Sequence, residues 1–190
     1  MVKEQQVEAA VRSMLDAIGD DPEREGLRDT PQRVARMYTE LFSGIGIDPG
    51  SAIDTLFSEE DHHGEVVLLR DVPFYSICEH HFLPFFGRAH MGYIPDGKIA
   101  GASKLARALE VIAKQPQLQE RMTGQLADAI NDVLKPDGVA VVLEAEHLCM
   151  SMRGVRKPGS SILTSATRGT FDRRGVTRGE LLGLLQQEAK

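Results

Sequence analysis

The sequence predicts an α+β protein in which N-terminal helices precede four strands and two helices. Two observations predict this order. Apolar residues recur at helical spacing up to about residue 41, and from residue 65 the pattern changes to the short apolar runs typical of strands. Two further helical patterns then separate a first pair of strands from a second pair. We therefore expect a helical region over residues 1–64 and a main domain over residues 65–190, packed as one structural unit.

The helical region should contain two amphipathic helices. Apolar residues recur every three or four positions over residues 7–18, and Gly19 follows as a typical helix end. Thr30 is a favourable N-cap and Pro31 a favourable first helical residue, so we expect the second helix to begin there. The polar residues 54–64 are expected to connect this region to the first strand.

The main domain should alternate between strands and helices in pairs. Buried strands are predicted by apolar and β-branched runs, and helices by apolar residues at spacings of three and four. The expected elements are strands over 65–75 and 82–94, helices from about Ser103 and from Pro116, strands over 139–145 and 161–167, and a short helix over 178–187.

Composition excludes several classes of function. The net charge of −6 gives no global basic field for nucleic acid, so an anionic ligand must be held by a local cluster. Two cysteines do not form a secreted disulfide framework, and the first residues do not resemble a signal peptide. The longest apolar run, residues 139–143, is too short to span a membrane. We expect a cytoplasmic protein without nucleic-acid or membrane partners.

Both cysteines have a histidine close by in the sequence. Cys78 and His81 are three residues apart and could grip one metal ion, but zinc needs three or four ligands. The remaining cysteine, Cys149, would complete a Cys-His-Cys set with a fourth position open to water, the pattern of a catalytic zinc site. The alternative is two buried free thiols and a packed histidine. If the metal hypothesis holds, the fold must bring residue 149 onto residues 78–81.

Two further histidines adjoin this set without being needed as ligands. His80 precedes His81, and His147 lies two residues before Cys149. Imidazoles beside a metal site are suited to proton transfer near neutral pH. The alternative is that both are ordinary surface or supporting histidines.

Phosphate-binding residues are less clearly indicated. Ser103, Lys104 and Arg107 open a helix after Gly101, where free backbone N–H groups and cations would suit a phosphate, although such a surface is also common on solvated helices. There is neither a P-loop nor a G-x-G-x-x-G motif. Weaker candidates that gain interest only from their neighbours are Arg153, Arg33, Arg36 and Glu120.

Taken together, these residues closely resemble the GTP cyclohydrolase I family of zinc enzymes. The resemblance runs in order from about residue 5 to the C-terminus, and Cys-Glu-His-His followed by His-x-Cys is its most specific part. The matching segments are residues 30–38, 78–81, 101–104, 119–121, 147–150, 153–154 and 164–166.

The resemblance implies a tunnelling fold, with a four-stranded antiparallel sheet, two helices on one face and preceding N-terminal helices. It also implies a homodecamer of two stacked pentamers with active sites between subunits. The reaction implied is hydrolysis of GTP to 7,8-dihydroneopterin triphosphate and formate, the first step of tetrahydrofolate and pterin biosynthesis.

Residue roles follow from the same resemblance. Cys78, His81 and Cys149 are implied to hold one zinc ion per subunit, which activates the water that attacks C8 of guanine. His80 and His147 are implied to move protons. Residues implied to bind the substrate are Glu120 at the guanine N–H edge with Gln119 beside it, Ser103, Lys104, Arg107 and Arg153 at the triphosphate, and Arg33 and Arg36 from a neighbouring subunit.

Some positions depart from the family pattern. Ala102 stands where leucine is common, residues 114–116 replace a basic stretch, and Arg36 replaces a frequent lysine, which changes the phosphate geometry. Iron(II) could occupy the same ligands. Two other hypotheses are a pterin or deazapurine enzyme on the same fold and a non-catalytic module that binds metal or nucleotide.

Overall fold

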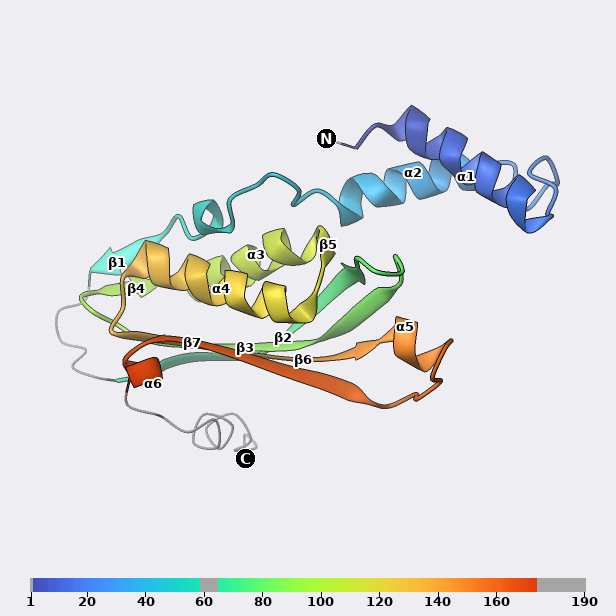
Figure 1. Ribbon diagram of the computed structural model, residues 1–190. Coiled ribbons are helices and arrows are strands. Elements are labelled where there is room, and N and C mark those ends of the chain that lie inside the picture. Colours follow the sequence, from blue (N-terminus) through green and yellow to red (C-terminus); the bar gives the residue numbers. More distant parts are fainter. Residues whose placement is uncertain (1, 59–64, 174–190) are drawn as a thin grey trace.

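A computed structural model describes residues 2–58 and 65–173 of the chain (Figure 1). Its elements, in chain order, are α1 (Glu4–Ile18), α2 (Thr30–Leu41), the 3-10 helix η1 (Pro49–Ala52), β1 (Leu56–Ser58), β2 (Val67–Cys78), β3 (Pro84–Ile94), β4 (Lys98–Ala100), α3 (Ala102–Ala113), β5 (Pro116–Gln117), α4 (Gln119–Leu134), β6 (Gly138–His147), α5 (Leu148–Ser151), β7 (Ser161–Gly169) and α6 (Thr170–Arg173).

The main sheet has the strand order β5-β2-β3-β6-β7. Its four long strands pair antiparallel, and α3 and α4 lie on the same face (Figure 1). This arrangement confirms the predicted α+β tunnelling fold. The structure adds two short pairings: β5 joins β2 in parallel, and β1 pairs with β4 in a separate two-stranded sheet.

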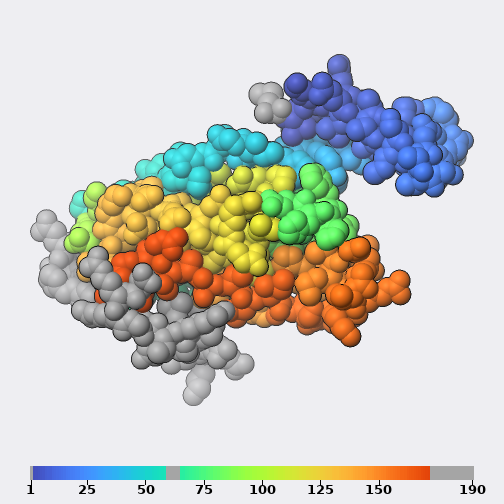
Figure 2. All heavy atoms as spheres, viewed as in Figure 1, coloured from blue at the N-terminus to red at the C-terminus, as the bar shows by residue number. Residues whose placement is uncertain are grey.

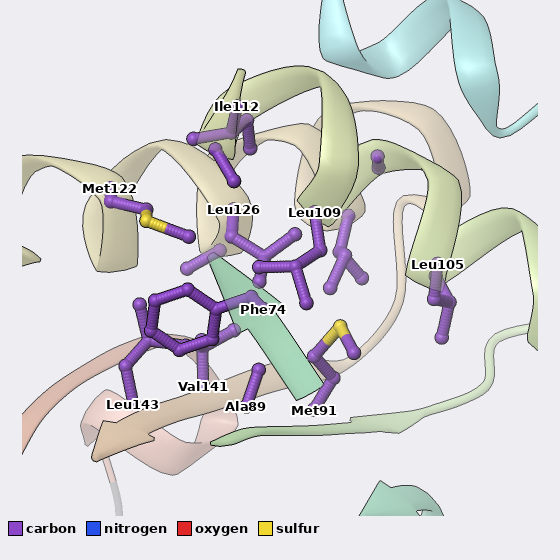
Figure 3. Close-up of a cluster of buried hydrophobic side chains, with 14 of the residues drawn as sticks. Phe74, Ala89, Met91, Leu105, Leu109, Ile112, Met122, Leu126, Val141 and Leu143 are labelled. Atoms are coloured by element: carbon purple, nitrogen blue, oxygen red, sulfur yellow. The ribbon is translucent and has the colours of Figure 1, made fainter. Parts of the chain in front are cut away.

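The core fills the space between the helices and the sheet (Figure 3). Alternate residues of β3 point to this face, because successive side chains of a strand point to opposite sides. Phe85, Ala89, Met91 and Tyr93 are accordingly all buried. Residues of the other elements that meet them are Phe74, Leu105, Leu109, Ile112, Met122, Leu126, Ile130, Val141 and Leu143.

Helices α1 and α2 pack together as a hairpin that projects beyond the sheet domain (Figure 2). The base of the hairpin is fixed at two points. The ring of Phe42 lies edge-on to that of Phe82, with centroids 5.9 Å apart, and the Gly44 N–H donates to the Lys114 carbonyl at 2.9 Å. A Cβ at Gly44 would lie 2.0 Å from the Val111 carbonyl oxygen, so only glycine permits this approach.

Three local predictions were wrong. Helix α2 begins at Thr30, and its N-cap is Asp29 rather than Thr30. Pro116 does not start α4 but lies in β5, where it pairs with Ile77 before the helix begins at Gln119. Part of the predicted 54–64 connection forms β1. The helix expected over residues 178–187, and residues 59–64 of the connection, lie outside the described residues.

Gly87 is the position where an added methyl group should cost the most. A Cβ there would lie 1.8 Å from the Glu144 carbonyl oxygen and 2.6 Å from the Ala145 Cα, so β3 and β6 would have to separate. We expect Gly87→Ala to lower the free energy of unfolding by about 1–3 kcal/mol or more, measured by denaturant titration. Gly124→Ala, in helix α4, is the matched control, because the nearest atom to the added Cβ would be Arg168 Nη2 at 4.0 Å. This change should raise the free energy of unfolding by about 0.5–1 kcal/mol. Equal effects of both changes would contradict this account.

Candidate metal centre and active site

The sheet topology explains how two distant cysteines meet. Strands β2 and β6 each pair antiparallel with β3, so they run in the same direction and end at the same edge of the domain. Cys78 is the last residue of β2, and His147 is the last residue of β6. Cys149 follows in the short helix α5, at this end of the sheet (Figure 1).

Cys78, His147 and Cys149 form a compact cluster. Their sulfur and imidazole nitrogen atoms all lie within 4.8 Å of one another. Two thiols and an imidazole are the donors that zinc prefers, and three protein ligands leave a position free for water or substrate. Burial raises the pKa of the Cys149 thiol, and the neighbouring Cys78 raises it further. A divalent cation would offset this repulsion between thiolates, so the residues present fit a metal of this kind.

His147 is held on its face and at its edge. The imidazole stacks on the ring of Phe85, with centroids 4.5 Å apart and planes 6° from parallel, while Nε2 lies 2.8 Å from Gln119 Oε1. Burial lowers the pKa of His147, and the charge of Glu120 partly opposes this shift. The ring is therefore placed to be neutral near neutral pH and to accept a proton.

His81 lies outside this three-residue cluster. Its side chain is exposed, and its Nε2 is 3.3 Å from Arg153 Nη1. His80 is also exposed, with its ring 6.3 Å from that of His81 in an edge-on arrangement. The predicted proximity of residues 78, 81 and 149 thus holds for the two cysteines, and the roles of His80 and His81 stay predictions.

Two residues predicted to bind the substrate, Gln119 and Glu120, lie in the first turn of α4. Glu120 is exposed in the first turn of the helix, close enough to His147 to influence its pKa. Gln119, predicted to bind substrate beside it, is buried and directs its amide to His147, and its role toward the substrate stays a prediction.

The cations predicted to bind phosphate do not gather at this end. Ser103, Lys104 and Arg107 lie in the first half of α3, next to β4, whereas the helix ends near β5 and the cluster (Figure 1). Twelve residues of α-helix span about 18 Å. Lys104 Nζ is 2.5 Å from Asp54 Oδ1, and this hydrogen bond lowers the pKa of Asp54.

Two of the three other predicted cations, Arg33 and Arg36, lie on the projecting hairpin. Arg33 pairs with Asp29 at 3.2 Å, and Arg36 is exposed. Among the predicted cations, Arg153 is the one that contacts a residue of the Cys-Glu-His-His segment.

Two contributors were missed at the sequence level. Phe85 stacks on His147, and its only signal was its inward position in β3. Arg121 forms an ion pair with Glu79, donates to the carbonyl of Pro116, and holds the pKa of the Glu79 carboxyl below its usual value. Arg121 lies within a motif of the resemblance and Phe85 outside those motifs, and neither was given a role because their partners are distant in sequence.

Comparisons with known proteins give one consistent result. A sequence model described as GTP cyclohydrolase I matches residues 7–186. A GTP cyclohydrolase 1 of Carboxydothermus hydrogenoformans is 56% identical over 190 residues, covering 100% of this chain and 98% of the relative. One of Dehalococcoides mccartyi is 57% identical, covering 99% of this chain and 100% of the relative. One of Geobacillus kaustophilus is 58% identical over 182 residues, covering 95% of this chain and 96% of the relative.

Proposed function

This chain belongs to the GTP cyclohydrolase I family, and we propose that the Cys78, His147 and Cys149 cluster is the centre at which it opens the guanine ring. The chain is an enzyme of that kind: it hydrolyses GTP to 7,8-dihydroneopterin triphosphate and formate, the first step of tetrahydrofolate and pterin biosynthesis. The observation that carries the proposal about the site is the convergence of the strand ends of β2 and β6, which places two thiols and an imidazole within 4.8 Å.

The proposed metal is zinc, bound by Cys78, Cys149 and His81. Support comes from the two thiols in the cluster and from the position of His81, three residues after Cys78. When bound, zinc would supply Lewis-acid activation of water for attack on C8 of guanine. Iron(II) would satisfy the same donors.

The histidines are proposed to move protons in this reaction. His147 is neutral near neutral pH because burial lowers its pKa, so it can accept a proton as the imidazole ring of GTP opens and return it when formate leaves. His80 is exposed beside His81 and is proposed to assist from the solvent side of the site.

Glu120 is proposed to recognise the guanine base. Its carboxylate is exposed near His147, and a carboxylate can accept hydrogen bonds from both N1–H and the 2-amino group of guanine. We expect Glu120→Gln to raise the KM for GTP by about 10-fold to 100-fold, since one charge-assisted bond is worth about 1.5–3 kcal/mol. Inosine triphosphate lacks the 2-amino group and is the matched probe. The wild type should prefer GTP to inosine triphosphate strongly and the variant weakly; an unchanged preference would contradict the role of Glu120.

A composite site between subunits is proposed for the triphosphate. Ser103, Lys104 and Arg107 begin α3 at the end away from the cluster, so one chain does not place them beside its own thiols. We propose that a neighbouring copy supplies them, together with Arg33 and Arg36 from a hairpin that projects from its domain.

The proposed assembly is a decamer of two pentamers. Over the described residues, β7 is one edge of the sheet, and the other edge of β2 is covered only at Ile77 and Cys78 by β5. Such edges can pair with each other between copies and close a ring of sheets.

A cytoplasmic location is also proposed, because Cys78 and Cys149 are both free thiols, as expected in a reducing compartment. No helix in the parts of the chain that the structure describes is long and apolar enough to cross a membrane.

The zinc content of single variants separates the two candidate histidines. We expect Cys78→Ser, Cys149→Ser and His81→Ala each to lose most of the bound zinc, measured by mass spectrometry of the purified protein, because each removes a ligand. His147→Ala should keep about one zinc per subunit. If His147→Ala loses the metal and His81→Ala keeps it, the ligands are the three residues of the cluster and the assignment of His81 is wrong.

A further inference from the structure

The amide of Gln119 is committed to partners within the protein. Its side chain is 1% exposed. Its Nε2 donates to the carbonyl oxygens of Leu143 at 3.1 Å and Ile162 at 2.8 Å, and to Thr164 Oγ1 at 3.1 Å. An amide nitrogen has two protons, so these three acceptors exhaust its capacity as a donor.

Two threonine hydroxyls fix which way the amide points. Thr123 Oγ1 donates to the backbone carbonyl of Gln119 at 2.7 Å, so in its contact with Thr164 Oγ1, also 2.7 Å, Thr123 must accept. The Thr164 proton is therefore used, and the oxygen of Thr164 can only accept from Gln119 Nε2. This directional order leaves Gln119 Oε1 as the atom that faces His147.

The orientation of the amide determines the state of His147. Gln119 Oε1 can only accept, so His147 Nε2, at 2.8 Å, carries a proton and donates it. In the neutral ring the lone pair is then on Nδ1, the one ring nitrogen able to accept a proton or offer a lone pair to the cluster. The stacked ring of Phe85 restricts the imidazole from the face.

We propose that Gln119 is a positioning residue that holds His147 in the tautomer protonated at Nε2, rather than a ligand of guanine. The proposal rests on the proposed function, in which His147 accepts a proton, and it changes the role assigned to Gln119 by resemblance. In this proposal Glu120 is the one residue of this turn of α4 that binds the guanine base, while the Gln119 side chain points inward and supports the imidazole of His147.

Removing Gln119 should affect turnover rather than binding. Without the amide, the His147 proton can occupy either nitrogen and the ring loses its edge contact, so fewer molecules have the reactive arrangement. Hydrogen-bond partners that orient metal-bound histidines typically contribute about 10-fold to 100-fold to activity, and we expect the same range for this imidazole. Gln119→Met, which keeps the length and removes the hydrogen bonds, should lower kcat by that factor while the KM and the equilibrium Kd for GTP stay within about three-fold.

A double-mutant cycle tests whether Gln119 acts through His147. In zinc-loaded protein, Gln119→Met added to His147→Ala should lower formate release from GTP by no more than about three-fold, because the group that it positions is already absent. If Gln119 instead bound guanine, Gln119→Met would raise the Kd for GTP, and the two effects would multiply. That result would overturn the proposal.

Gln117→Met controls for the loss of a buried amide. Gln117 is also 1% exposed; its Nε2 donates to the Ile112 carbonyl and to Gln125 Oε1, its Oε1 accepts from Arg121 Nε, and none of these hydrogen bonds involves His147. The Gln117→Met variant should lower the melting temperature about as much as Gln119→Met does, but its kcat should stay within about three-fold of the wild-type value. An equal loss of kcat in both variants would make the effect of Gln119 merely structural.

A spectroscopic readout keeps this proposal separate from the proposed function. In protein with ¹⁵N-labelled histidine, assigned by comparison with His147→Ala, the wild type should show a protonated Nε2 and an unprotonated Nδ1, and Gln119→Met a mixture of tautomers. If the wild type shows that state but releases no formate, the proposed function fails and the assignment of Gln119 stands. A wild-type signal with the proton on Nδ1 overturns the assignment of Gln119 whatever the activity.

Discussion

Replacing His147 by alanine is expected to lower formate release from GTP by on the order of 10²–10⁴-fold, the usual contribution of a general acid-base residue. The physical reason is that the imidazole is buried, neutral and within 4.8 Å of both thiol groups, where a proton must be accepted and returned. The measurement is the rate of formate release by zinc-loaded protein at saturating GTP. The Kd for GTP should change little, since the residue acts on the reaction rather than on binding.

His90→Ala is the matched control for this prediction. His90 is a half-buried histidine of β3 whose Nδ1 accepts from the Asp71 N–H at 3.3 Å, and it lines a different cavity with Arg88 and Glu144. We expect it to leave formate release within about three-fold. Comparable losses in the two variants would mean that the effect of His147→Ala reflects stability rather than proton transfer.

Mixing two inactive variants should restore activity if the site is shared between copies. One variant carries Cys149→Ser, and the other carries Lys104→Ala together with Arg107→Ala. Each should be nearly inactive alone, the first because it lacks a metal ligand and the second because two phosphate contacts are worth on the order of 10²–10³-fold at subsaturating GTP. In a randomly mixed ring of equal parts, about a quarter of the sites combine an intact cluster with an intact neighbouring α3.

Hybrid rings are obtained by co-expression of the two variants with different affinity tags, and the control places all three changes in one chain. Hybrids of that triple variant with Cys149→Ser contain no intact cluster and should stay inactive. Should the first hybrids also show no more activity than the sum of their parts, the phosphate residues and the cluster must belong to a single chain.

The sequence predicted the parts of the fold and site that depend on local pattern. The strand and helix order followed from apolar spacing. The proximity of Cys78 to Cys149 followed from the need of a metal ion for more than two ligands. Their meeting has a topological cause, since β2 and β6 run in the same direction on either side of β3.

The features that the sequence did not predict depend on contacts between distant segments. Pro116 looked like a helix start, but pairing with Ile77 places it in a strand. Gln119 looked like a substrate ligand next to Glu120, and only the carbonyls of Leu143 and Ile162 show that it points inward. Likewise, no local pattern indicates that α3 carries Lys104 to the end away from the cluster.

The most direct test of the central claim is the product analysis of zinc-loaded protein incubated anaerobically with GTP. Formate and 7,8-dihydroneopterin triphosphate are measured together, the second by its absorbance and fluorescence, with His147→Ala and Cys149→Ser alongside. We predict equal amounts of the two products from the wild type and loss of both in each variant. GTP left intact by folded, zinc-loaded wild-type protein would contradict the account, and formate without pterin would limit the activity to ring opening.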